Sequence, residues 1–199
     1  MNVAHLRYPL ILMVGLFAGC KSATVHLYTL EPDSTSNPSQ IPARPLKDTF
    51  ILEQVLIPRQ IDRKELILRT SARELNLLEN YNRAAPLREE VRYALTADLR
   101  LALANSSDAT PLDHRPTTFV SIDIRDWEST IHAVMLKAEW RLKRLGTTEP
   151  LETRCESAFL ESTTGKADDL VRADQALLEH LAQAIDHVIR SSTPANCGQ

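Results

Sequence analysis

The chain has 199 residues, and its 23 Lys and Arg against 26 Asp and Glu give a formal net charge of −3 at pH 7. This balance lacks the broad basic field that binding to nucleic acids requires, so we expect no nucleic acid among the partners. Acidic and basic residues are interleaved along the chain, which is typical of a solvated surface.

The amino-terminal segment has the form of a signal peptide that ends at a cysteine. An uncharged run over residues 8–19 follows Arg7 and the free amino terminus. A helix that spans a membrane needs about 20 apolar residues, and this run is shorter, which favours removal over retention. The small residues Ala18 and Gly19 suit a peptidase that cuts just before Cys20, whose thiol can carry a lipid.

The stretch Phe17-Ala18-Gly19-Cys20 resembles the lipobox of bacterial lipoproteins, whose cysteine receives a diacylglycerol thioether and an acylated amino end. Several acyl chains make such an anchor effectively permanent. We therefore predict a lipoprotein signal peptide over residues 1–19 and a single periplasmic domain over residues 20–199. The alternative is an ordinary secreted protein that is cut near Ala18, with Cys20 as an incidental thiol.

The residues after the cysteine bear on the choice of membrane. In many Gram-negative bacteria an aspartate at this position retains a lipoprotein at the inner membrane, whereas this chain has Lys21 and Ser22. We therefore expect the mature chain to be attached to the lipid bilayer of the outer membrane and to face the periplasm.

Two cysteines remain once Cys20 is lipidated, namely Cys155 and Cys197. An oxidising periplasm would permit them to pair, so a disulfide between them is one expectation. Neither has a second cysteine or a histidine at a zinc-ligand interval, so we expect no metal site.

The first half of the mature chain contains strand signals and one polar linker. Residues 33–45 are rich in Pro, Ser and Asn and are expected to form a flexible loop. Pro58 cannot donate to a central ladder and should interrupt the strand that precedes it. Strands are expected over residues 26–30, 49–57 and 65–70, and near residues 74–80.

The second half combines helical and strand periodicity. An amphipathic helix is predicted after Pro86 by apolar residues at every fourth position: Leu87, Val91, Leu95, Leu99 and Leu103. A second helix is predicted over residues 167–191. Half-buried strands are predicted over residues 117–130, 132–145 and 151–162. Trp140 lies on the apolar side of its strand and is expected in the core, with a ligand groove as the alternative. Together these elements predict an α+β fold with a mainly antiparallel sheet and two long helices packed on one face.

Side chains with catalytic or ligating chemistry are scattered. His180 and His187 lie two helical turns apart, too far to chelate one metal without a third ligand, and are interpreted as surface residues. The acid pairs Glu89-Glu90 and Asp168-Asp169 lie near predicted helix starts, where they favour the positive end of the helix dipole. General acid–base catalysis is the weaker alternative for these acids, because no titratable cluster accompanies them.

Enzymatic activity has no support in the sequence motifs. The chain lacks a glycine-rich phosphate loop, a nucleophile elbow and a metalloprotease helix. We therefore expect a protein that is not an enzyme, with no cofactor other than the covalent lipid on Cys20.

Several segments in a fixed order carry a family resemblance. A lipobox is followed by LYTLEP, by a long stretch with two strands and a helix, and later by AEWRL on an alternating strand. This order resembles the auxiliary lipoproteins of MCE-type ABC transport systems, the PqiC/YmbA group. The likeness is strongest over residues 28–103 and weaker over residues 117–190.

The most specific pieces of this resemblance are two short motifs. The family's L-P-x-x-(I/L)-D-R stretch is Ile57-Pro58-Arg59-Gln60-Ile61-Asp62-Arg63 here. Its W-A-E-P-L stretch before the helix corresponds to Arg83-Ala84-Ala85-Pro86-Leu87, which lacks both the tryptophan and the glutamate.

The resemblance implies a lipoprotein that docks a periplasmic MCE-domain protein to the outer membrane for lipid transport between membranes, and that forms a homo-oligomer. Partner contacts are expected from Tyr28 and Leu30 on the first strand and from Asp62 and Arg63 on the loop near Pro58. For Asp62 and Arg63, a local hydrogen bond that fixes the turn is the favoured interpretation. The alternatives are a lipoprotein that binds a lipid or small molecule in its own cavity and an assembly factor for the outer membrane.

Overall fold

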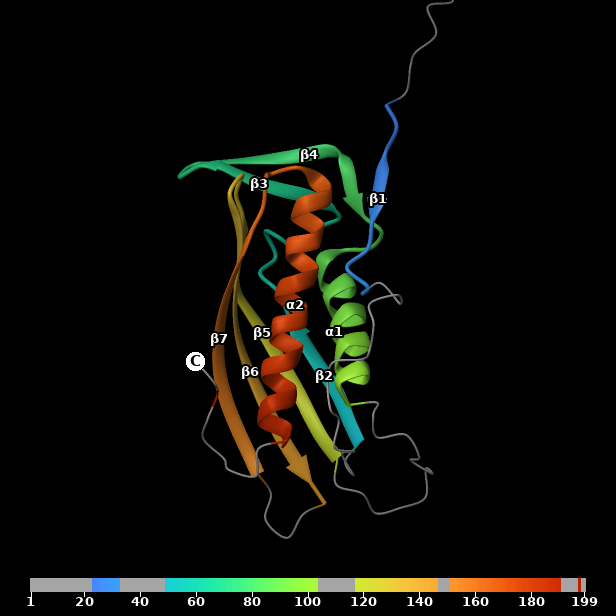
Figure 1. The fold of residues 1–199 in the computed structure, drawn as a ribbon, viewed down its shortest axis with the longest axis vertical. Helices are drawn as coiled ribbons and strands as arrows, with labels where there is room; N and C mark the ends of the chain where they lie inside the picture. Colours follow the sequence, from blue (N-terminus) through green and yellow to red (C-terminus); the bar gives the residue numbers. More distant parts are fainter. Residues whose placement is uncertain (1–22, 33–48, 104–116, 147–150, 191–196, 198–199) are drawn as a thin grey trace, which may run out of the picture.

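The computed structural model describes residues 23–32, 49–103, 117–146, 151–190 and 197. Within these ranges the chain forms seven strands and two helices (Figure 1). Their bounds are β1 (His26–Tyr28), β2 (Thr49–Leu56), β3 (Glu65–Ser71), β4 (Glu74–Arg83), α1 (Leu87–Leu103), β5 (Thr117–Ser129), β6 (Ala133–Leu145), β7 (Leu151–Ser162) and α2 (Ala167–Arg190). The predicted loop over residues 33–45 lies outside the described residues.

The strands form two sheets. One has the order β2-β5-β6-β7, in which β5, β6 and β7 are antiparallel neighbours and β2 is parallel to β5. The other has the order β1-β4-β3, with β3 and β4 antiparallel and β1 parallel to β4. The α+β class and the mainly antiparallel pairing are confirmed. The expectation of one sheet is wrong, because alternation along a strand shows which face is buried and not which strand lies beside it.

Both helices cover the same face of the four-stranded sheet. They pack against each other, with α1 also in contact with β2 and α2 in contact with β6 and β7 (Figure 1). The stripe on α2 that faces this layer consists of Leu170, Leu177, Leu178, Leu181 and Ile185, all buried. Burial of this stripe against the sheet makes the helix stable, since an isolated helix gains little from propensity alone.

Alternation along β5 and β6 separates a buried face from a polar one. Trp140 lies in the core as expected, where its indole N–H donates to the Ser157 hydroxyl at 3.1 Å. The other hydrophobic core residues of the two strands are Val120, Ile122, Ile124, Trp127, Val134, Leu136, Ala138 and Leu142. No described element covers the opposite face of the sheet, so helices protect one side and water meets the other.

The β3–β4 hairpin lies across one end of the molecule, at the top of Figure 1. β2 ends just before Pro58, as predicted, and the backbone N–H groups of Ile61 and Asp62 both donate to the Pro58 carbonyl at 3.1 and 3.2 Å. A single parallel bridge, between Arg69 and Thr130, connects β3 with the end of β5. The small sheet therefore needs further contacts to be held against the large one.

Candidate interaction site

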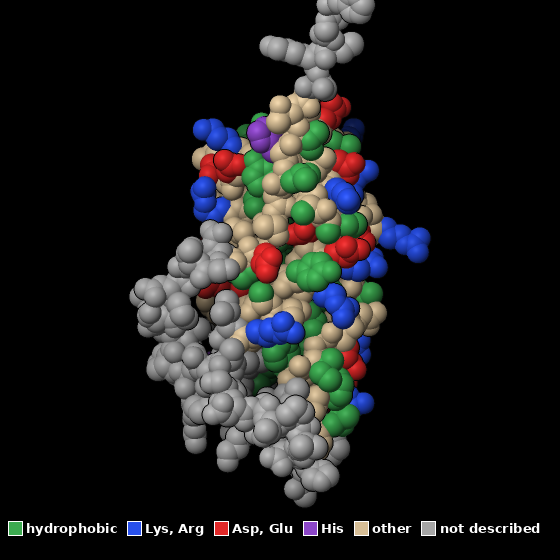
Figure 2. All heavy atoms as spheres, turned by 90° about the vertical axis from the view of Figure 1, so that its right-hand side faces the viewer, with side chains coloured by type: hydrophobic (Ala, Val, Ile, Leu, Met, Phe, Trp, Pro, Cys, Tyr) green, Lys and Arg blue, Asp and Glu red, His purple; other side chains and the backbone are tan. Residues whose placement is uncertain are grey.

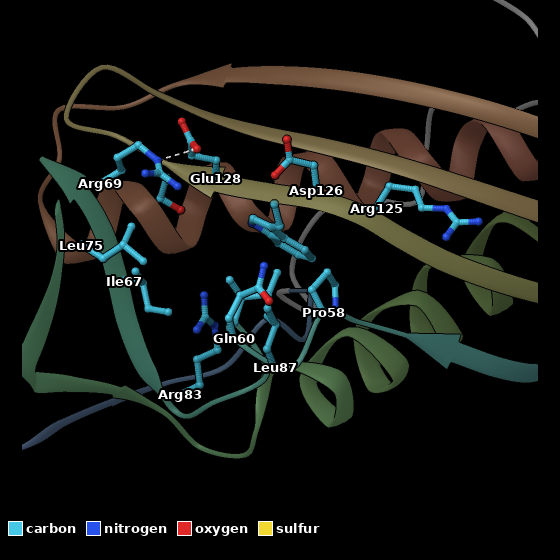
Figure 3. A pocket seen from close by; sticks show the side chains of 13 residues that line it. Pro58, Gln60, Ile67, Arg69, Leu75, Arg83, Leu87, Arg125, Asp126 and Glu128 are labelled. Atoms are coloured by element: carbon cyan, nitrogen blue, oxygen red, sulfur yellow. Dashed lines mark hydrogen bonds and ion pairs between the residues drawn. The ribbon is translucent and has the colours of Figure 1, made fainter. Parts of the chain in front are cut away.

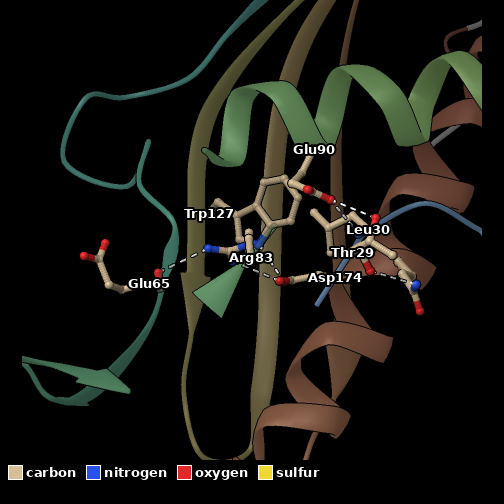
Figure 4. Close-up of polar contacts among 8 residues, drawn as sticks. Thr29, Leu30, Glu65, Arg83, Glu90, Trp127 and Asp174 are labelled. Carbon is tan, nitrogen blue, oxygen red and sulfur yellow. Dashed lines mark hydrogen bonds and ion pairs between the residues drawn. The ribbon is translucent and has the colours of Figure 1, made fainter. Parts of the chain in front are cut away.

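Side chains from both helices hold the segment that contains β1. The Tyr28 hydroxyl donates to Asp168 Oδ1 at 2.5 Å. The Leu30 N–H donates to Glu90 Oε2 at 2.9 Å (Figure 4). The Gln175 amide donates to the two backbone carbonyls on either side of Leu30, at 3.3 and 3.2 Å. β1 is thus attached to the first turn of α2, and the chain just after it to the first turn of α1 and to Gln175 farther along α2.

The Tyr28 phenol is a persistent donor. Its hydrogen bond to the Asp168 carboxylate, assisted by partial desolvation and by the negative charge of Asp168, raises the pKa of Tyr28 to about 12. The hydroxyl therefore keeps its proton throughout the physiological pH range, and the contact between β1 and α2 does not titrate there.

Glu90 is buried and accepts hydrogen bonds from three donors. Besides the Leu30 N–H, the Thr29 hydroxyl donates to Oε2 at 3.0 Å and the Ala85 N–H donates to Oε1 at 3.0 Å (Figure 4). Sequence reasoning assigned Glu90 only to the helix dipole and missed this role. The available signal was its position on the same helical face as Leu87 and Val91, where an acid has to find partners.

A buried ion pair connects the small sheet to α2. Arg83, at the end of β4, lies 3.2 Å from Asp174 Oδ2, and the two side chains are 6 and 1% exposed. The Trp127 indole N–H donates to Asp174 Oδ1 at 2.9 Å, and Arg83 also donates to the Glu65 carbonyl at 3.3 Å (Figure 4). Burial raises the pKa of Asp174, while the Arg83 guanidinium and the indole N–H oppose this rise.

Asp62 caps a helix from a distant turn. Its Oδ1 accepts the Arg88 N–H at 2.9 Å, and its Oδ2 lies 2.9 Å from the Arg88 guanidinium. The favoured interpretation, a local side-chain bond within the turn, is therefore corrected: backbone bonds to Pro58 close the turn and the carboxylate is free to reach α1. Arg63 is 43% exposed and pairs with Glu65 at 3.2 Å.

The expected partner contacts at β1 divide into two cases. The Leu30 side chain is only 1% exposed, so its assignment as a surface contact is corrected: it belongs to the core. Tyr28 is half-buried and is bound to Asp168, and its carbonyl accepts the Ala84 N–H at 2.8 Å. Tyr28 thus binds the connection between β4 and α1, and Asp62 binds the first turn of α1.

A cavity of about 140 Å³ lies between the β3–β4 hairpin and β5, beside the turn after Pro58 (Figure 3). Ile67, Leu75 and Trp127 contribute apolar walls, and an ion pair of 2.5 Å between Arg69 and Glu128 lies at its margin. The cavity is smaller than the 300 Å³ or so that is usual for pockets binding drug-sized ligands. It can accommodate one or two small side chains.

The uncovered face of the four-stranded sheet carries charged side chains that pair across strands. Arg125 on β5 lies 2.7 Å from Glu139 and 2.9 Å from Asp123, and Arg154 on β7 pairs with Glu139 as well. Hydrogen bonds from Arg125 and Arg154 lower the pKa of Glu139. An open hollow of about 550 Å³ lies beside these residues. A surface of paired charges of this kind suits contact with another polar surface.

The three cysteines have different positions. Cys20 lies outside the described residues. In the structure a disulfide joins Cys155 on β7 to Cys197, with their Cα atoms 5.5 Å apart. Cys155 is buried and Cys197 packs against the core, so the bond fastens the carboxyl-terminal end of the chain to the four-stranded sheet.

Metal-binding and membrane-spanning features are absent from the part of the chain that the structure describes. No group of three or more His, Cys, Asp or Glu side chains there could hold a metal ion. His187 is exposed, as interpreted from the sequence, whereas His180 is partly buried beside Phe159 and lies 3.4 Å from Glu161. Within the same ranges, neither helix has the length and apolar character needed to cross a bilayer.

The fold and these contacts define a two-helix α+β domain. Its buried polar clusters hold the elements together, and the uncovered face of its sheet exposes paired charges. The model of the family of ABC-type transport auxiliary lipoprotein components matches residues 28–186. The chain therefore belongs to this family, which is a family of transport components and not of known enzymes. As a lipoprotein component of a transport system, the protein is associated with a membrane.

Solved structures show the same fold. A protein described as uncharacterized is 19% identical, with a TM-score of 0.58, and the match covers 84% of this chain and 99% of the other. A protein from Xanthomonas campestris, described with the family DUF330, is 15% identical, with a TM-score of 0.54 and coverage of 83 and 95%. No curated protein sequence matches the chain.

Replacement of Asp174 with alanine should destabilise the domain by about 3–5 kcal/mol, because it leaves the Arg83 guanidinium buried without its partner. The control is Arg172→Ala, which removes a pair with Asp169 at 2.8 Å whose side chains are 72 and 26% exposed. This exposed pair should contribute no more than about 1 kcal/mol. Urea unfolding measures both values, and equal losses for the two variants would contradict the role assigned to Asp174.

The disulfide between Cys155 and Cys197 should contribute about 4 kcal/mol, from the loop entropy of its 42-residue separation. We expect Cys197→Ser to lower the free energy of unfolding by this amount under oxidising conditions. The difference from the wild type should disappear once a reductant is added. Two free thiols that titrate in the unreduced, unfolded wild type would show that the bond does not form.

Proposed function

We propose that this protein is an outer-membrane lipoprotein that docks a periplasmic MCE-domain protein of an ABC-type lipid transport system, and that it acts as a homo-oligomer. The family assignment supports a role as an auxiliary transport component. The lipobox-like Phe17-Ala18-Gly19-Cys20 supports anchoring through a lipid on Cys20, and Lys21 after it supports the outer membrane. The anchor holds the domain at the membrane while its surfaces bind the transporter.

The observation that carries the docking role is the uncovered face of the four-stranded sheet. Its charged residues are paired across strands and form a polar surface that extends to the edge strand β7. Edge strands can add a strand from a partner, and β1 has such an edge in the small sheet. The cavity of about 140 Å³ is small for a lipid, and the hollow of about 550 Å³ is open and bordered by charged side chains, so neither favours the alternative of a lipid carried inside the domain.

The anchor is tested by Cys20→Ala. This variant should stay unprocessed by the lipoprotein peptidase and be missing from the outer-membrane fraction, because the acyl chains can no longer be attached. Arg172→Ala serves as the control, since it changes an exposed residue and leaves the lipobox and the disulfide intact. Intact-mass spectrometry checks the wild type directly, and an unmodified Cys20 would refute the anchor.

Docking is tested by co-purification with an MCE-domain protein and its ABC permease from detergent-solubilised membranes. Deletion of residues 33–45 should weaken the association and leave the fold intact, because it removes no residue of a described element. A Gly- and Ser-rich segment of equal length in the same place controls for loop length. Charge reversal of Arg125 and Arg154 should also weaken binding, whereas reversal of Arg172 on α2 should not. No association at any ionic strength would overturn the proposal.

A further inference from the structure

One end of the domain exposes a group of apolar side chains. Of the ten large hydrophobic side chains that are exposed within the described residues, six belong to the segment of β1, to β4, to the β5–β6 turn and to the last part of β7. These six are Val25, Leu27, Leu75, Leu77, Ile131 and Leu160. Figure 2 shows hydrophobic side chains among the charged ones on one side of the molecule, up to this end.

Several contacts bring these segments together at the end where the β3–β4 hairpin lies (Figure 1). Thr130, next to Ile131, forms the bridge to Arg69 of β3. Gly165, just before α2, has a φ of 77° and lies close to Ile131. A Cβ added to Gly165 would lie 3.0 Å from the Cα of Ile131. Leu160 pairs with Met135, at the start of β6. The apolar residues therefore share one end of the fold.

The opposite end lies a helix length away. Tyr28 contacts Asp168 in the first turn of α2, and Arg144 donates to the Ile189 carbonyl in its last turn at 3.0 Å. The 21 residue steps from Asp168 to Ile189 rise about 32 Å, at 1.5 Å per step. Leu145, next to Arg144, thus marks the far end of the domain, and it is 38% exposed, as Leu77 is.

The chain before β1 is too short to separate the apolar end from a membrane. Six residue steps connect Cys20 to His26, and a fully extended chain covers about 20 Å in that number of steps. β1 itself cannot move away from the fold, because it pairs with β4 and is attached through Tyr28 to α2. A lipid on Cys20 thus holds β1 within about 20 Å of the bilayer, whereas the Leu145 end lies about 30 Å from β1 along the domain.

We propose that this end of the domain, formed by the β1 segment, the β3–β4 hairpin and the β5–β6 turn, rests on the lipid bilayer. Apolar side chains that are exposed on the protein gain favourable apolar contacts at the interface between lipid headgroups and acyl chains, which water cannot provide. α2 then runs away from the membrane, and the Leu145 end points into the periplasm. This inference rests on the lipid anchor of the proposed function and adds an orientation to it.

Fluorescence quenching tests the orientation in the full-length lipidated protein, reconstituted into vesicles of phosphatidylethanolamine and phosphatidylglycerol. Leu77→Cys and Leu145→Cys are a matched pair, because both side chains are 38% exposed and lie at opposite ends. Each is labelled with bimane, while Cys155 and Cys197 are protected in their disulfide. A nitroxide-labelled lipid should quench the label at position 77 several-fold more than the label at position 145. Ile131→Cys should behave as Leu77→Cys does.

Equal quenching at positions 77 and 145 would overturn the orientation. Protection of position 77 from aqueous iodide without quenching by lipid would also overturn it, since a second copy or another protein would then cover this end. Intact mass separates this failure from a failure of the proposed function: an unlipidated Cys20 refutes the anchor, whereas a lipidated protein with equal quenching refutes only the membrane contact.

Discussion

The ion pair between Arg83 and Asp174 determines how the parts of this domain are held together. It lies where β4 ends, against α2 and the indole of Trp127, and water reaches neither charge. Away from it, β3 meets the end of β5 through the bridge between Arg69 and Thr130 and through the ion pair between Arg69 and Glu128. Because a buried charge without its partner is costly, the small sheet has one favourable position against the helices and the large sheet.

Carboxylates from beside the helix starts extend this arrangement to the connecting segments. Glu90 of α1 accepts a hydrogen bond from the backbone after β1, and Asp168 of α2 accepts one from the Tyr28 hydroxyl. Asp62, in the turn after Pro58, accepts one from the backbone at the start of α1. Each negative charge lies near the positive end of a helix dipole and also accepts hydrogen bonds from a distant segment. The same residues therefore stabilise the helices and fix the chain that leads toward Cys20.

This architecture suits a protein that acts by position. The helices bury one face of the four-stranded sheet, and the other face keeps a paired set of charges on Arg125, Glu139 and Arg154. The segment before β1 is short, so the proposed anchor would keep β1 within about 20 Å of the membrane. Under the proposed function, the domain would hold the membrane and the transporter partner in a defined order.

The sequence by itself determined the elements and their buried faces. Periodicity located both helices and the long strands, Pro58 marked the end of β2, and the alternation around Trp140 identified the core side of β6. These are local properties, because each depends on residues only a few positions apart. The family resemblance likewise followed from short motifs read in order.

Only the tertiary structure decided the partners. Arg83 pairs with Asp174 at a separation of 91 residues, and Leu30 donates to Glu90 across 60. The acids could have been noticed as charged residues on apolar helical faces, but nothing local indicates which group approaches them. The parallel pairing of β1 with β4 could not be predicted from the sequence either, because an alternating strand shows the same pattern beside any neighbour. Such contacts exist only when the whole chain has folded, since burial of the entire core brings the two groups together and makes an unpaired charge costly.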